Sequence, residues 1–160
     1  MIRSKGQNAV EYMMTYGWAI LVVMVVGIVV WQMGFLDLTK NVSPDKRGFS
    51  QVVPIDWVLS QEGTLSIVVQ NNAGSIVDVG GAGEGTSANI MVGGGTACAI
   101  SSGTPVEDFR PASTIKIEFD CGAAGRKVGD YYRVNVSIQY TNPTSGLSHL
   151  SNGIVWGPVG

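Results

Sequence analysis

The sequence Trp18-Ala-Ile-Leu-Val-Val-Met-Val-Val-Gly-Ile-Val-Val-Trp31 lies within a region, between Glu11 and Asp37, that contains no charged residue. With its apolar flanks it forms a run of about 24 residues, and about 20 are enough to cross a bilayer. The run is apolar around the whole circumference of a helix, unlike an amphipathic surface helix. We therefore predict a long hydrophobic, membrane-spanning α-helix over residues 7–40.

Charges and aromatic residues at the two ends orient this helix. Trp18 and Trp31 stand near opposite ends, where interfacial aromatic residues are common, and Arg3 and Lys5 precede the run. The positive-inside rule then places the N-terminus in the cytoplasm and the chain after Leu36 outside. A cleaved secretory signal has a shorter apolar core that ends in a small-residue cleavage site. Neither feature is present, so we expect the helix to remain in the mature protein.

The rest of the chain has a different pattern. Residues 41–48 are polar and are expected to form a linker, and from residue 49 short Val- and Ile-rich runs alternate with Gly and Asn clusters. Several runs have a period of two, which is typical of half-buried antiparallel strands. The expected class is α+β, with an immunoglobulin-like antiparallel β-sandwich over residues 49–160. The candidate strands are Gln51–Leu59, Thr64–Gln70, Ile76–Val79, Ala88–Val92, Ala97–Ile100, Thr114–Phe119, Tyr131–Tyr140 and Gly153–Trp156.

Composition argues against several classes of function. The 160 residues include 10 basic and 12 acidic side chains, whereas a nucleic-acid binder needs a clustered basic face. His149 is the only histidine, and no nucleophile elbow accompanies it. The Gly-rich segment 80–85 lacks the Gly-Lys-Ser/Thr ending of a phosphate loop. We therefore expect no enzyme activity, catalytic residues, cofactor or nucleic-acid partner. We also expect no metal site, since Glu107, Asp108, Asp120 and Asp130 lack the spacing of a calcium loop.

The first residues carry the most specific motif. Lys5-Gly6-Gln7 is followed by Glu11-Tyr12 and then by the charge-free helix. This arrangement resembles the start of an archaeal type IV prepilin with a class III signal peptide. The resemblance implies that a membrane peptidase removes residues 1–6 as a leader, cutting between Gly6 and Gln7 on the cytoplasmic side. The hydrophobic helix would then begin the mature chain.

The resemblance also implies an assembly role for Gln7, Glu11 and Tyr12. A carboxylate at the edge of a membrane helix is costly unless it is paired. In a growing filament the α-amino group of a neighbouring copy would pair with Glu11 and set the axial register. The other interpretation is that Glu11 lies at the headgroup level and is hydrated.

The expected protein is a structural subunit of an extracellular adhesion pilus, with a membrane-inserted precursor. Its expected partners are other copies of itself in a helical homopolymer, the prepilin peptidase and assembly machinery, the membrane before assembly, and surfaces or other cells. Two alternatives remain: a motility-filament subunit, and a single-pass membrane-anchored β-sandwich that binds a ligand and keeps Arg3 and Lys5.

Two kinds of modification are expected outside the cell. Cys98 and Cys121 are the only cysteines, and an extracellular location favours a disulfide between them over two free thiols. Asn41-Val-Ser43 and Asn135-Val-Ser137 match the N-glycosylation pattern, whereas Asn142-Pro-Thr does not. We therefore predict glycans at Asn41 and Asn135.

Overall fold

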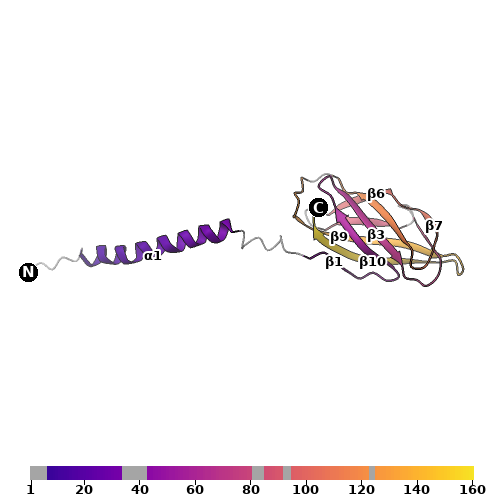
Figure 1. Ribbon diagram of the computed structural model, residues 1–160, viewed down its shortest axis with the longest axis horizontal. Helices are drawn as coiled ribbons and strands as arrows, with labels where there is room; N and C mark the ends of the chain where they lie inside the picture. The colour runs from indigo at the N-terminus through magenta and orange to yellow at the C-terminus, as the bar shows by residue number, and fades with distance from the viewer. Residues whose placement is uncertain (1–6, 34–42, 81–84, 92–94, 123–124) are drawn as a thin grey trace, which may run out of the picture. The chain divides into compact units, whose positions relative to one another are not determined.

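The chain divides into two compact units, Met1–Leu38 and Thr39–Gly160. The computed structural model describes residues 7–33, 43–80, 85–91, 95–122 and 125–160, with side chains from Val10 onward. The first unit contains one element, α1, which spans Gln7–Gln32 as an unbroken helix (Figure 1). Its 26 residues extend for about 39 Å at 1.5 Å per residue. The expected helical residues 34–40 lie outside the described part of the chain.

Helix α1 has no buried face within its own unit. Its described side chains from Val10 to Gln32 are exposed apart from Val30, which is half-buried. The segment Val10–Gln32 has the length and composition of a membrane-spanning helix. An apolar helix of this kind needs an apolar environment on all sides, either lipid or other helices.

The second unit is an antiparallel sheet domain, so the class is α+β, as predicted. Its strands are β1 (Asp45–Arg47), β2 (Val52–Leu59), β3 (Thr64–Asn71), β4 (Val77–Val79), β5 (Ser87–Ile90), β6 (Thr96–Ser102), β7 (Val106–Phe109), β8 (Thr114–Asp120), β9 (Tyr131–Asn142) and β10 (Leu147–Pro158). All eight predicted strands are present with shifted ends. Strands β1, β7 and the first half of β10 were not predicted.

One correction concerns the predicted linker 41–48. Residues Asp45–Arg47 within it form β1, which pairs with β10 from Asp45 opposite Trp156 to Arg47 opposite Ile154. Three charged residues carry no apolar alternation, so the pattern gave no signal for a strand. The chain is therefore tied to the sheet four residues earlier than expected.

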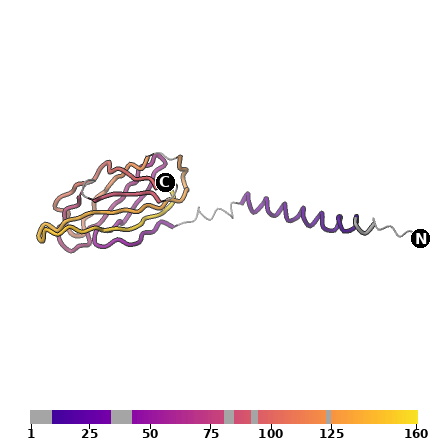
Figure 2. Tube along the Cα trace, turned by 180° about the vertical axis from the view of Figure 1, so that it is seen from behind, coloured from indigo at the N-terminus to yellow at the C-terminus, as the bar shows by residue number. Residues whose placement is uncertain are grey.

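The sheet order is β1-β10-β9-β5-β6-β8-β3-β2, with β4 between β9 and β7. Strand β6 changes partner along its length: Cys98 is opposite Ala88 of β5, while Ala99 is opposite Asp120 of β8. This change lets the sheet turn a corner, and Figure 2 shows the strands curling around a common interior.

Side-chain hydrogen bonds connect β2, at one end of the sheet order, with β10, which is next to the other end. The Ser151 hydroxyl on β10 donates to the Val52 carbonyl of β2 at 2.7 Å, and Trp57 Nε1 donates to the Trp156 carbonyl at 3.1 Å. Pro54 fits on β2 because β2 is an edge strand in the ladder and has a bulge between Pro54 and Asp56. The sheet is nearly closed, with β2 facing β10 across this seam.

The core lies inside the curled sheet and follows the predicted alternation of β8 and β9. On β9 every second side chain from Tyr132 to Tyr140 is buried, as the period-two pattern predicted. The largest fully buried side chains are Phe119, Leu59, Leu65, Ile67, Ile90, Ile117 and Ile138. Their burial supplies the main stabilising free energy of the domain.

Alkaline pH is expected to destabilise this core through Tyr132. Burial raises the pKa of the Tyr132 phenol to about 12, and a hydrogen bond from the Leu59 backbone partly opposes this rise. The folded state favours the neutral phenol, so this stabilising contribution is complete below about pH 10 and is lost as pH rises toward 12. Unfolding by urea across this range should show a steeper loss of stability for the wild type than for Tyr132→Phe. Parallel pH profiles for the two proteins would contradict the assignment.

Candidate assembly site on the N-terminal helix

The polar residues of α1, apart from Gln32, lie in its N-terminal half. Glu11, Tyr12, Thr15 and Tyr16 lie on one side of the helix, because residues three and four positions apart are neighbours on a helix surface. The Thr15 hydroxyl donates to the Glu11 carbonyl at 2.8 Å, which leaves the Glu11 carboxylate free of that hydroxyl. All four side chains are exposed.

The two tyrosines form a small aromatic surface beside Glu11. The rings of Tyr12 and Tyr16 have centroids 4.7 Å apart, and the Tyr16 hydroxyl donates to the Tyr12 hydroxyl at 3.4 Å. Such a pair presents apolar rings and polar tips together. A carboxylate next to this surface can receive a cation, such as an ammonium group, from a second chain.

Several predicted site residues lie at or beyond the limits of the described chain. Gly6 and Asn41 fall outside the described residues. Gln7 begins α1, and only its backbone is described. Glu11 and Tyr12 are placed side by side as above, and the pairing of Glu11 with a second copy remains a prediction.

Asn135 lies in the middle of β9 on the outward face. Its side chain is exposed, between its register partners Asn89 on β5 and Ile154 on β10. The Ser137 hydroxyl of the same triplet donates to Asn152 Oδ1 at 2.6 Å. The exposed amide is accessible, and glycosylation at Asn135 stays a prediction.

The cysteines are joined by a disulfide, Cys98–Cys121, as expected from the sequence. Because Ala99 and Asp120 are register partners, the cysteines face each other one step along the β6–β8 ladder, with Cα atoms 4.1 Å apart. Both are buried. The bond therefore fastens β6 to β8 at the point where β6 changes partner.

Removing this disulfide is expected to lower the free energy of unfolding by about 3 kcal/mol, the loop-entropy value for a bridge of this span. The variant is Cys98→Ala combined with Cys121→Ala, in the full chain held in detergent. Urea unfolding followed by tryptophan fluorescence measures the loss. Reduced wild-type protein is the control and should lose a similar amount. An unchanged unfolding midpoint in both would contradict the stabilising role.

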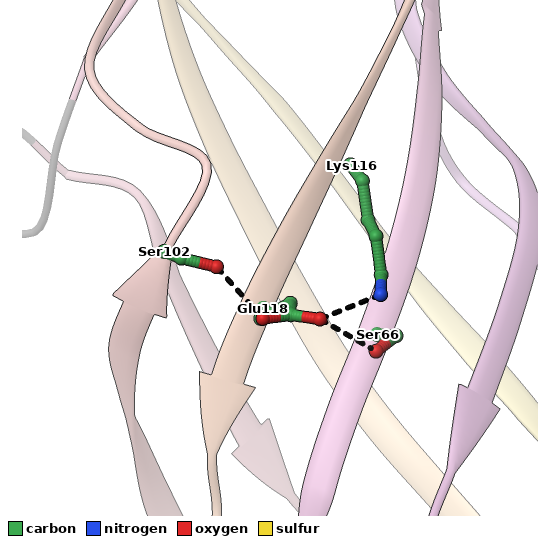
Figure 3. A network of polar contacts seen from close by, with 4 residues as sticks. All are labelled: Ser66, Ser102, Lys116 and Glu118. Carbon is green, nitrogen blue, oxygen red and sulfur yellow. Dashed lines mark hydrogen bonds and ion pairs between the residues drawn. The ribbon is translucent and has the colours of Figure 1, made fainter.

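A polar network lies on the outward face of the sheet across β3, β8 and β6 (Figure 3). Glu118 accepts hydrogen bonds from Ser102 at 2.8 Å and Ser66 at 3.5 Å, and pairs with Lys116 at 2.6 Å. The hydrogen bond from Lys116, followed by that from Ser102, lowers the pKa of Glu118. The carboxylate therefore stays ionised, but its exposure makes the ion pair a weak contributor to stability. The network joins three strands.

The residues that were considered for hydrolysis or metal binding do not form a site of either kind in the described part of the chain. His149 stacks on Tyr140, with ring centroids 5.4 Å apart. Within the described ranges, no group of three or more His, Cys, Asp and Glu side chains is placed to hold a metal ion.

No known protein family, curated protein or solved structure matches this chain.

One feature of the β-domain was missed by the sequence interpretation. A cavity of about 530 Å³ lies beside the β9–β10 hairpin, lined among others by Asp78, Glu107, Gln139 and Ser148. Asp78, Glu107 and the hairpin residues come from three separate parts of the sequence and share no motif. The pairing of β4 with β7 and β9, and of β9 with β10, brings them together.

Proposed function

We propose that this chain is a structural subunit of an extracellular archaeal type IV adhesion pilus. The observation that carries the proposal is α1, an unbroken helix from Gln7 that is uncharged between Glu11 and its end at Gln32. Its side chains are exposed around the circumference, so the helix needs either lipid or other helices as neighbours. Two motifs, Lys5-Gly6-Gln7 and Glu11-Tyr12, favour a succession of neighbours. The helix would lie in lipid before cleavage and would pack against other copies of itself afterwards.

In this proposal the prepilin peptidase cuts between Gly6 and Gln7, and cleavage removes Arg3 and Lys5. Losing these cytoplasmic charges eases withdrawal of the helix from the membrane, because they hold its end at the headgroups. Each new subunit then pairs its α-amino group with Glu11 of a neighbour. The protein acts mechanically and has no catalytic turnover.

We further propose that the β-domain is a variant of the immunoglobulin-like sandwich and forms the outer layer of the filament. Two groups of strands support this assignment: β1, β10, β9, β5 and β4 with β7 on one side, and β8, β3 and β2 on the other, linked through β6. Greek-key sandwiches commonly join their sheets by such strand crossings.

Peptide mass spectrometry of filaments sheared from the source cells tests the proposal. We expect a peptide from this chain that begins at Gln7 in the filament fraction. The masses of the peptides containing Asn41 and Asn135 report glycosylation in the same run. A chain found only in membranes, with Arg3 and Lys5 still present, would overturn the proposal and favour the membrane-anchored binding protein.

A further inference from the structure

We propose that the cavity beside the β9–β10 hairpin binds an uncharged sugar, and we call it the hairpin cavity. This inference rests on the proposed function, because it names the class of ligand that the outer domain of a surface filament would bind.

The hairpin cavity is built on a row of side chains across three strands. Asp78 of β4 is the register partner of Thr141 on β9, and Thr141 is the partner of Ser148 on β10. Register partners share a face, and the buried neighbours Val79 and Tyr140 point to the core, so the row points outward. The Thr141 and Ser148 hydroxyls lie 2.9 Å apart.

Strand β7 supplies the opposite wall. It pairs with the other edge of β4, with Val106 opposite Val79, and this places Pro105 and Glu107 at the cavity. The volume of about 530 Å³ is within the range of small-molecule sites, about 300–1,000 Å³. The cavity is large enough for one or two sugar rings.

Hydrogen bonds hold the base of the hairpin cavity in place. Asp78 Oδ1 accepts the Asp108 backbone N–H at 2.9 Å. The Thr86 hydroxyl donates to the Gly80 carbonyl at 2.6 Å and accepts the Gln139 backbone N–H at 3.2 Å. A preformed site loses little conformational entropy when a ligand binds.

The lining matches the hydrogen-bonding groups of a sugar. Each sugar hydroxyl can donate and accept. The carboxylates of Asp78 and Glu107 accept, and the Gln139 amide and the Thr141 and Ser148 hydroxyls do both. Pro105 and Val106 add an apolar edge suited to the C–H face of a ring.

The charge of the lining residues argues against anionic sugars. None of the described lining residues is Lys, Arg or His, while two are carboxylates. A sialylated, sulfated or phosphorylated glycan would face repulsion with no compensating cation. The lining therefore selects neutral sugars.

The position of the cavity suits contact with an outside partner. The chain joins the sheet through β1, which pairs with β10 at Ile154–Trp156. Ser148 lies at the other end of β10, beside the turn of the hairpin that projects past the neighbouring strands in Figures 1 and 2. The cavity is thus at the end of the domain far from where the chain joins it.

A glycan array probed with the full chain tests the inference. The chain is produced without glycans and held in a detergent that has no sugar headgroup, so that neither fills the cavity. The array carries neutral, sialylated and sulfated cell-surface glycans. Glycans released from the filaments form a separate set, which distinguishes binding to a foreign surface from binding to a neighbouring subunit. We expect binding to neutral glycans in at least one set.

Two variants and a matched control locate the binding. Ser148→Trp fills the cavity, and Glu107→Ala removes one exposed acceptor. Glu107→Ala should raise the dissociation constant at least about tenfold, as expected for a lost hydrogen bond to a charged group. Ser148→Trp should weaken binding at least as much, because its indole occupies the space of the ligand. Glu62→Ala removes the same charge from the exposed β2–β3 turn and should leave binding unchanged.

Absence of binding to neutral glycans, preference for anionic glycans, or binding that both cavity variants retain would overturn the inference. Unassembled chains are used, so a failure here leaves the filament proposal standing. Equally, a failure to find processed filaments would leave the array result intact.

Discussion

Glu11→Ala is expected to abolish pilus formation while leaving cleavage of the leader intact. In the proposed filament, apolar helices such as α1 pack together and exclude water, and Glu11 is the only carboxylate on the described helix. Removing it leaves the neighbour's α-amino group buried without a counter-charge, which costs about 3–5 kcal/mol. That cost corresponds to a loss of more than about a hundredfold in the affinity of each added subunit. Sheared filament mass and electron microscopy measure the effect.

The matched control for this prediction is Glu62→Ala, which removes an exposed carboxylate from the β-domain. It should give normal filaments, so a general effect of lost negative charge is separated from the local effect at Glu11. Wild-type filament yield from Glu11→Ala would contradict the pairing and support the interpretation of Glu11 as a hydrated residue at the headgroup level.

Gly6→Val is expected to block processing and to hold the precursor in the membrane with no filaments. The proposed cut lies directly after Gly6, and a branched side chain at that position would hinder access of the peptidase to the bond. The uncut chain also keeps Arg3 and Lys5, which anchor the helix at the cytoplasmic side. Immunoblots of membrane and sheared fractions measure the effect, with the precursor running slightly larger than the mature chain.

Together the two variants separate processing from assembly. Glu11→Ala should yield mature chain without filaments, and Gly6→Val should yield precursor alone. If Gly6→Val formed normal filaments of mature length, the cleavage site would be wrong and the motif at residues 5–7 would need another explanation.

The sequence predicted the helix and most strands because their patterns depend on local periodicity. The charge-free run gave α1, and the alternation from Tyr132 to Tyr140 gave the buried face of β9. Strand β7, Val106–Phe109, has two acidic residues at its centre and gave no such signal. The first half of β10 has no period-two apolar alternation, since Leu147 and Leu150 are three residues apart, and its first four residues are exposed because they lie on the projecting part of the hairpin.

Strand order and the hairpin cavity could not be predicted from local sequence patterns. The exchange of partners along β6 depends on register between segments far apart in sequence, and periodicity carries no information on register between segments. Asp78 and Ser148 are likewise neighbours only because both flank Thr141. The cysteines gave one long-range contact in advance, since only one pairing was available.

Strand β1 has a mechanical consequence. It runs antiparallel to β10, and the chain reaches it from the end of the domain opposite the hairpin turn. A pull between residue 43 and that turn therefore draws β1 and β10 past each other along their shared axis. In this shear geometry the three register pairs from Asp45–Trp156 to Arg47–Ile154 bear the load together instead of peeling apart one by one. A ladder of only three residues can thus act as a clamp against tension along the domain.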